Sequence, residues 1–137
     1  MSGETGFAFH HVGIVTQQFE KSIALYEQFG AVLTGDFHDP IQKARIGLMK
    51  AEASPLVEII CPESDDSPAA GWVRRIQAGP YHTCYEVPDI DACIARFRKS
   101  GFWLLSEPVP AVAFAMRQVA FLWSPTIGLL ELLEGSE

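Results

Sequence analysis

The chain repeats itself, and this internal repeat constrains its fold more than any other feature. The segment Phe9–Val15 near the start resembles Pro80–Val87, and the alignment places His11 opposite His82. The same offset pairs Phe19 with Ile90, Ile23 with Ile94, Ala24 with Ala95, Tyr26 with Phe97, Gly30 with Gly101 and Leu33 with Leu104. Because each copy of a repeat folds into the same supersecondary unit, we expect two copies of one module.

The ends of the two copies match as well. Leu56–Ile60 resembles Leu129–Leu133, and a slightly longer offset pairs Glu58 with Glu131. Each copy therefore begins with a histidine-bearing segment and ends with a glutamate-bearing one. The two histidines are pseudo-symmetric equivalents, and so are the two glutamates. This is how a metal site would be assembled between two fused modules.

Composition and charge exclude several classes of protein. The chain has 137 residues, 48% of them hydrophobic and 20% charged, which favours one packed domain. Its net charge is −7 and its basic residues are scattered, so we expect no nucleic-acid partner. No apolar run approaches the roughly 20 residues of a membrane span, and the start lacks the features of a secretory signal. We therefore expect no membrane partner and a cytoplasmic location.

The cysteines predict no cross-links. Cys61, Cys84 and Cys93 are odd in number and lack C-x-x-C spacing. This pattern favours neither a disulfide framework nor a thiolate zinc site, so we expect all three to be reduced.

Hydrophobic periodicity predicts the same order of elements in each copy. In the first copy an amphipathic helix over 17–29 carries Phe19, Ile23 and Tyr26 on one face, and Gly30 ends it. A second such helix runs from Pro88 to Gly101, and a short connecting helix is expected over 69–77. The expected strands cover 7–15, 31–34, 44–49 and 56–60 in the first copy and 81–87, 102–106, 117–122 and 128–133 in the second.

We therefore predict an α+β fold of two tandem βαβββ modules that form an incomplete barrel around a metal cleft. Module one spans 7–61, a linker 62–79 and module two 80–134, all within a single domain of residues 1–137. Each half-sheet has one face under its helix and the other bare. Two such units side by side would line one cleft with their bare faces.

Four residues of this cleft are candidate metal ligands. Side chains alternate between the faces of a strand, so a histidine on the first strand and a glutamate on the last strand of a module can share a face. The four candidates are His11, Glu58, His82 and Glu131. Two imidazoles and two carboxylates suit a divalent ion such as Zn, Ni, Co, Mn or Fe. In an octahedral site, such a set leaves positions for substrate oxygens.

Structural interpretations compete with these assignments. A histidine on an apolar strand is more often a core or surface residue than a ligand, but the repeat favours ligation here. An ionised glutamate inside an apolar strand is costly unless it is paired or coordinated. His10 and His38 receive no metal role. Trp72, Trp103 and Trp123 are expected to pack in the core or at an interface rather than on a substrate.

The layout resembles the vicinal oxygen chelate superfamily, which includes glyoxalase I, methylmalonyl-CoA epimerase, extradiol dioxygenases and bleomycin-resistance proteins. The resemblance covers nearly the whole chain and is closest to methylmalonyl-CoA epimerase-like and lactoylglutathione lyase-like proteins. The segments that carry it are 11–15, 57–62, 66–68, 81–87 with 89–90, 119–122 and 128–134. It implies a divalent metal (Zn, Ni, Co or Mn) on His11, Glu58, His82 and Glu131.

One position departs from the epimerase pattern. The residue that matches the separate catalytic glutamate, counting back from Glu58, is Gln42, and an amide cannot accept a proton as a base. Asp39 is the nearest carboxylate. We therefore expect epimerisation of methylmalonyl-CoA to be weak or absent.

The chemistry that such a site supports is proton abstraction next to a carbonyl. A divalent cation stabilises the charge that develops on the carbonyl oxygen. Glu131 and Glu58 are the predicted catalytic acid and base. An anionic substrate needs local positive charge, for which Lys43, Arg45, Arg74, Arg75 and Arg117 are candidates. We assign Gln42, Arg45 and Arg117 to substrate binding.

Three classes of function stay open. The first is a metal-dependent isomerase, epimerase or lyase acting on a CoA, carrier-protein or glutathione thioester or a hemithioacetal. The second is a resistance-type protein that sequesters a small molecule, although a cleft with that function needs no set of metal-ligating side chains. The third is a ferrous oxygenase, which typically uses three ligands rather than four. Exposed strand edges also predict a homodimer, with each active site built within one chain.

Overall fold

The computed structural model describes residues 6–135, and the chain divides into two compact units. One unit, here called the first module, spans His11–Tyr81. The second module combines the described residues from His82 onward with those up to His10. The boundary passes through two strands, β1 (Ala8–Val15) and β5 (Gly79–Val87), so each of these strands contributes residues to both modules.

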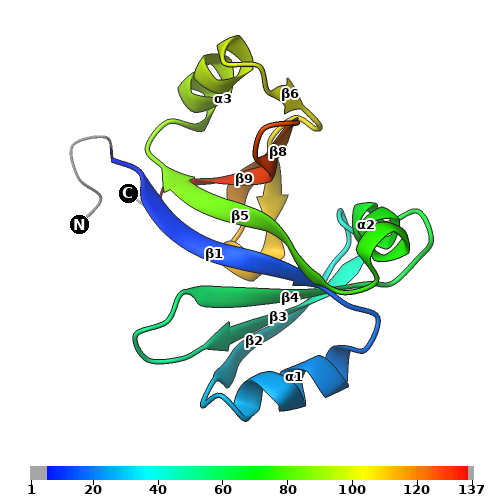
Figure 1. The fold of residues 1–137 in the computed structure, drawn as a ribbon. Coiled ribbons are helices and arrows are strands. Elements are labelled where there is room, and N and C mark those ends of the chain that lie inside the picture. The colour runs from blue at the N-terminus through cyan, green and yellow to red at the C-terminus, as the bar shows by residue number, and fades with distance from the viewer. Residues whose placement is uncertain (1–5, 136–137) are drawn as a thin grey trace. The chain divides into compact units, whose positions relative to one another are not determined.

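The first module is a four-stranded sheet with a helix on one face. Its elements follow in the order β1, α1 (Phe19–Glu27), β2 (Val32–Asp39), β3 (Ala44–Lys50), β4 (Leu56–Pro62) and α2 (Pro68–Ile76). The strands pair in the order β2-β3-β4-β1. β1 and β4 run parallel, whereas the other pairs are antiparallel. Figure 1 shows α1 lying along β2, β3 and β4.

The apolar stripe of α1 packs against this sheet. The buried core consists of Ile14, Phe19, Ile23, Ala31, Met49 and Ile59. The helix ends at Glu27 rather than at the predicted residue 29, because the next amides donate to carbonyls three residues back, which tightens the last turn. Gly30 then adopts φ +88°, a left-handed conformation that glycine tolerates best and that ends the helix.

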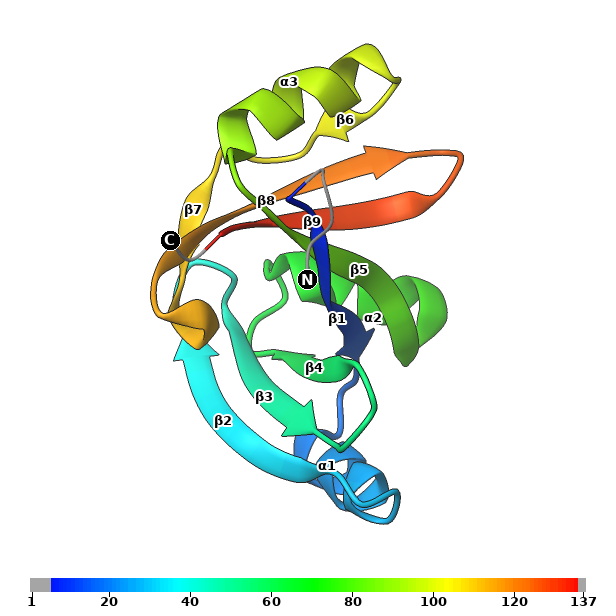
Figure 2. The same cartoon turned by 90° about the vertical axis from the view of Figure 1, so that its left-hand side faces the viewer.

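The second module repeats this plan. Its elements follow in the order β5, α3 (Ile90–Lys99), β6 (Trp103–Leu104), β7 (Val109–Ala111), a 3₁₀ turn (Val112–Phe114), β8 (Arg117–Ser124) and β9 (Gly128–Glu134). The strands pair in the order β5-β9-β8-β6, with β7 also on β8, and β5 runs parallel to β9. Figure 2 shows α3 above β6 and β8. The core consists of Val87, Ile90, Cys93, Ile94, Ala120, Leu122, Leu130 and Leu132.

Several boundaries differ from those predicted. The strand expected over 31–34 extends to Asp39, because it pairs with β3 along its whole length. The strand expected over 102–106 shrinks to Trp103–Leu104, and β7 was not predicted. Pro108 precedes β7 and Pro110 lies within it. Proline has no amide hydrogen to donate to a strand ladder, so the pairing of this part of the chain stays short. α3 begins at Ile90 rather than at Pro88, because Asp89 caps it by accepting a hydrogen bond from the Ala92 amide.

The α+β class and the pair of βαβββ modules are confirmed by this architecture, with β7 as an addition to the second module. The segment predicted as a linker contains α2, which packs against β4 of the first module. No helix in residues 6–135 is long and apolar enough to cross a membrane. The single-domain organisation, the homodimer and the cytoplasmic location stay predictions.

Candidate functional site

The first module brings His11 and Glu58 together. His11 lies on β1 and Glu58 on β4, and their parallel register pairs His11 with Leu56 and Gly13 with Glu58. The two side chains therefore share one face of the sheet, two positions apart. The distance from His11 Nε2 to Glu58 Oε1 is 3.0 Å, and both side chains are buried.

The second module contains an equivalent pair. His82 lies on β5 and Glu131 on β9, in a parallel register that pairs His82 with Leu129 and Cys84 with Glu131. The distance from His82 Nε2 to Glu131 Oε1 is again 3.0 Å, and both side chains are buried. The sequence repeat is thus reproduced in atomic detail within each module. We call these the first and the second His–Glu pair.

Each pair has the chemistry of a metal ligand set. A carboxylate away from water is costly unless it is hydrogen-bonded or coordinated. In each pair an imidazole nitrogen faces the carboxylate oxygen at 3.0 Å. That distance fits a hydrogen bond, and it also fits two neighbouring ligands at right angles on a cation with bonds of about 2.1 Å. Each pair therefore suits a borderline divalent ion as well as a proton.

The strand next to Glu58 adds no further acid or base to that face. β3 pairs with β4 so that Leu48 lies opposite Glu58 and Ile46 opposite Ile60. Ala44, Ile46 and Leu48 therefore share the face of Glu58, and all three are apolar. The carboxylate of the first pair is the only one that β3 and β4 present on this face.

Arg45 lies on the opposite face of β3. Its guanidinium stacks 4.0 Å from the Phe19 ring of α1 and makes two hydrogen bonds to Asp36, at 3.0 and 2.8 Å. It also donates to Glu20 at 2.7 Å. These hydrogen bonds lower the pKa of the Asp36 carboxyl and raise the pKa of the guanidinium. The structure thus ties Arg45 to the helix side of the first module and does not bring it to the first His–Glu pair.

Gln42 lies in the turn between β2 and β3. Its backbone amide donates to Asp39 Oδ1 at 3.0 Å, and its backbone carbonyl accepts a hydrogen bond from Ser67 Oγ at 2.7 Å. Ala44, where β3 begins, is four residues from Leu48, or roughly 13 Å along the strand. Gln42 therefore lies well away from Glu58, and its role in substrate binding stays a prediction.

Arg117 lies on the same face of the second module as the second pair. It starts β8, and alternation along that strand places it with Phe121, which pairs with Glu131. Its guanidinium donates to Glu86 and, at 3.1 Å, to the carbonyl of Glu134. Of the predicted substrate-binding residues, Arg117 is the one that the fold places on a His–Glu face, and its role stays a prediction.

Sequence reasoning missed Phe121. Its ring packs edge-on against the imidazole of His82, with the ring centroids 5.4 Å apart and an interplanar angle of 85°. The only signal was that the predicted strands 117–122 and 128–133 follow each other; the register that places Phe121 directly across from Glu131 comes from the structure. Trp103 was expected to pack in the core or at an interface. It is 60% exposed on the short edge strand β6, so it is not a core residue, and the interface alternative stays a prediction.

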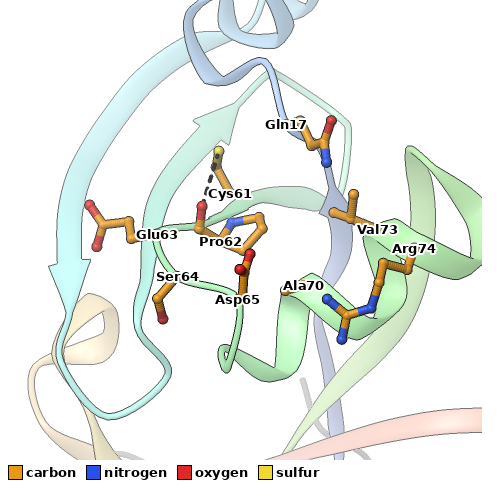
Figure 3. A pocket seen from close by; sticks show the side chains of 9 residues that line it. All are labelled: Gln17, Cys61, Pro62, Glu63, Ser64, Asp65, Ala70, Val73 and Arg74. Carbon is orange, nitrogen blue, oxygen red and sulfur yellow. Dashed lines mark hydrogen bonds between the residues drawn. The ribbon is translucent and has the colours of Figure 1, made fainter.

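A pocket of about 410 Å³ lies elsewhere in the first module, where β4 ends and α2 begins (Figure 3). Its lining consists of Gln17, Cys61, Pro62, Glu63, Ser64, Asp65, Ala70, Val73 and Arg74. Burial raises the pKa of the Cys61 thiol, which keeps it protonated and weakly nucleophilic at neutral pH. Neither residue of the first pair lines this pocket, so it is separate from the candidate ligands.

Comparison with known proteins identifies the family of the chain. The model of the Glyoxalase/Bleomycin resistance protein/Dioxygenase superfamily matches residues 10–121. The chain belongs to this superfamily. The match includes the first pair and His82 but ends before Glu131. The membership inferred from the sequence is confirmed.

Three individual proteins illustrate the relationship. The ethylmalonyl-CoA/methylmalonyl-CoA epimerase of Cereibacter sphaeroides is 27% identical over 114 residues, which are 82% of this chain and 85% of that protein. The mitochondrial methylmalonyl-CoA epimerase of Homo sapiens is 30% identical over 127 residues, 90% of this chain and 71% of that protein. A crystal structure of methylmalonyl-CoA epimerase from Mycobacterium tuberculosis is 23% identical, with a TM-score of 0.85 over 100% of this chain and 94% of that one. The last likeness concerns the fold.

The placement of Arg45 generates a prediction about stability. Replacing Arg45 with Ala removes its stacking on Phe19 and its contacts with Asp36 and Glu20, so the free energy of unfolding in urea should fall by about 1 kcal/mol. Arg45→Lys should recover only part of this loss, because an ammonium group cannot form the two parallel bonds to Asp36. The exposed Arg98→Ala is the control and should change stability by less than about 0.5 kcal/mol. Weaker substrate binding by Arg45→Ala at unchanged stability would contradict this assignment.

Proposed function

We propose that the chain is a metal-dependent isomerase, epimerase or lyase that removes a proton next to the carbonyl of a thioester or hemithioacetal. The observation that carries this proposal is the duplicated His–Glu pair, buried and spaced at 3.0 Å in both modules. The fold itself needs no such buried polar pair on either sheet, because a buried pair is often no more stable than apolar residues of similar volume. Relatives that are named as epimerases of acyl-CoA compounds support the same chemistry.

The proposed cofactor is one divalent ion, Zn, Ni, Co or Mn, held jointly by His11, Glu58, His82 and Glu131. Each pair alone offers one nitrogen and one oxygen, whereas protein sites for such ions usually supply three or four ligands. Imidazole and carboxylate ligands suit this group of metals. When bound, the cation stabilises negative charge on the carbonyl oxygen while the neighbouring proton leaves.

The proposed acid and base are Glu131 and Glu58. β3 adds no carboxylate to the face of the first pair. Asp39 of β2 lies opposite Ala44 on the same face, but its Oδ1 accepts hydrogen bonds from the backbone amides of Ile41 and Gln42 at the end of the strand. The pairs are therefore the favoured source of the base. One glutamate accepts the proton from the carbon next to the carbonyl. If the other returns a proton to the same carbon from the opposite side, the reaction is an epimerisation. If a proton is returned to the neighbouring carbon, the reaction is an isomerisation of the glyoxalase type.

The proposed substrate is a small molecule that carries its acyl group on CoA, a carrier protein or glutathione. The relatives' names, which refer to CoA esters, favour CoA among these carriers. Arg117 is the favoured cation for an anionic substrate group, since it lies on the face of the second pair. Methylmalonyl-CoA itself is expected to be a poor substrate, because no separate glutamate stands on β3 beside the first pair.

The metal proposal predicts a loss of binding when either pair is broken. Protein purified without added metal should contain about one divalent ion per chain, measured by elemental analysis after extensive dialysis. His82→Ala should lower metal affinity at least about tenfold, because it removes one ligand of the set. His38→Ala is the matched control, since His38 is exposed and faces Glu63 rather than a pair. A fully loaded and folded His82→Ala protein would contradict the ligand assignment.

The catalytic proposal predicts proton exchange. Metal-loaded protein in D₂O should replace the hydrogen next to the carbonyl of a bound thioester or hemithioacetal with deuterium, followed by NMR. Glu131→Gln should slow this exchange by about a hundredfold or more, because an amide is not a base. The exposed Glu107→Gln is the control and should exchange at the wild-type rate. If no thioester or hemithioacetal takes up deuterium, the catalytic proposal is contradicted and the resistance-type binding function is favoured instead.

A further inference from the structure

Four large apolar side chains line the face of the second module that carries the second His–Glu pair. Trp103 pairs with Trp123 across β6 and β8, and Phe121 pairs with Glu131 across β8 and β9. Leu105 follows β6, and its amide donates to the carbonyl of Phe121 at 2.8 Å. Alternation along the strands puts all four on one face, whereas Leu104 between them packs against the core under α3. We call Trp103, Leu105, Phe121 and Trp123 the aromatic wall.

The wall is exposed at its outer end and touches the pair at its inner end. Trp103 is 60% exposed and Leu105 is 56% exposed. The indoles of Trp103 and Trp123 stack with their centroids 5.5 Å apart and an interplanar angle of 8°. At the inner end the Phe121 ring packs against the imidazole of His82. A contiguous apolar surface of this kind on a small protein marks a binding surface rather than scattered exposure.

The first module lacks this wall, although it repeats the pair. The repeat places Val32, Thr34, Leu48 and Lys50 at the equivalent positions, so the two tryptophans correspond to a valine and a lysine. The helix stripes and the His–Glu pairs are similar in both modules. The fold therefore does not require the aromatic side chains, and their presence in one module only points to a ligand that is bound asymmetrically.

We propose that the aromatic wall binds an aryl group on the acyl part of the substrate, next to the carbon that loses its proton. This inference rests on the proposed function and names the substrate class of the same site. Aromatic rings prefer offset-stacked or edge-to-face contacts, and the exposed indole of Trp103 and the ring of Phe121 offer both. The four wall residues carry no charge, so the wall itself suits an uncharged aryl group rather than a carboxylate, whereas Arg117 lies at the other end of β8 on the same face.

A matched pair of ligands isolates the contribution of the aryl group. The probes are S-phenylacetyl-N-acetylcysteamine and S-acetyl-N-acetylcysteamine, which differ by one phenyl ring and lack a nucleotide. Isothermal titration of zinc-loaded full-length protein should show that the phenylacetyl thioester binds about tenfold more tightly or better, because a ring is removed from water. Tryptophan fluorescence should change with that probe.

Variants on the two modules locate this preference. Trp103→Ala should reduce it to less than about threefold, and Trp103→Phe should retain part of it. Since Trp103 is largely exposed, the truncation should leave the cooperative unfolding transition in urea intact. Val32→Ala, at the equivalent position of the first module, should leave the preference intact. Equal binding of both probes, binding of neither, or a preference that survives both Trp103→Ala and Trp123→Ala would overturn the proposal.

Two further measurements distinguish aryl binding by the wall from the proposed reaction and from dimer formation. Deuterium exchange is followed in the same samples: a phenyl preference without exchange supports the wall and contradicts the proposed reaction. Equally efficient exchange in both thioesters, without a phenyl preference, supports the reaction and overturns the wall. Sedimentation tests the other occupant, a second copy of the chain. A wild-type dimer that Trp103→Ala dissociates would assign the wall to subunit contact and overturn the proposal.

Discussion

The pairing of the first and last strands within each module is the interaction on which the candidate site depends. β1 and β5 open the modules, β4 and β9 close them, and each opening strand runs parallel to its closing strand. Parallel neighbours need a long connection between them, and the helix and two or more intervening strands supply it. This pairing places a histidine and a glutamate that are distant in sequence on one face, two positions apart. A slip of one residue in either register would turn the glutamate to the helix side.

Burial makes these pairs costly to the stability of the fold if either partner is lost. His11 and Glu131 are almost completely inaccessible, and their partners nearly so. Removing one partner of a buried pair leaves the other unsatisfied, at a cost of about 3–5 kcal/mol. A module that keeps such a pair therefore commits part of its stability to a polar contact that packing does not need. That commitment in both modules is the physical reason to assign the pairs a chemical role.

The sequence predicted those features that depend on periodicity, and it could not predict those that depend on register. The repeated helix stripe, with Phe19 and Ile23 in the first copy, was sufficient to predict the two modules. The copied histidines and glutamates were sufficient to name the candidate ligands. Arg45 and Ile46 are neighbours, and only the pairing of β3 with β4 shows that Ile46 shares a face with Glu58 whereas Arg45 does not. The position of Phe121 against His82 likewise required the β8–β9 register.

The proposal that the two His–Glu pairs hold a single ion together has a spectroscopic test. X-ray absorption spectroscopy of the nickel- or zinc-loaded protein counts the imidazoles around the metal. Joint binding by both pairs predicts two imidazoles per ion, nitrogen and oxygen ligands at about 2.0–2.2 Å, and one ion per chain by elemental analysis. One imidazole per ion with two ions per chain would show that the pairs act independently. A spectrum without imidazole ligands would show that the metal does not bind to the His–Glu pairs.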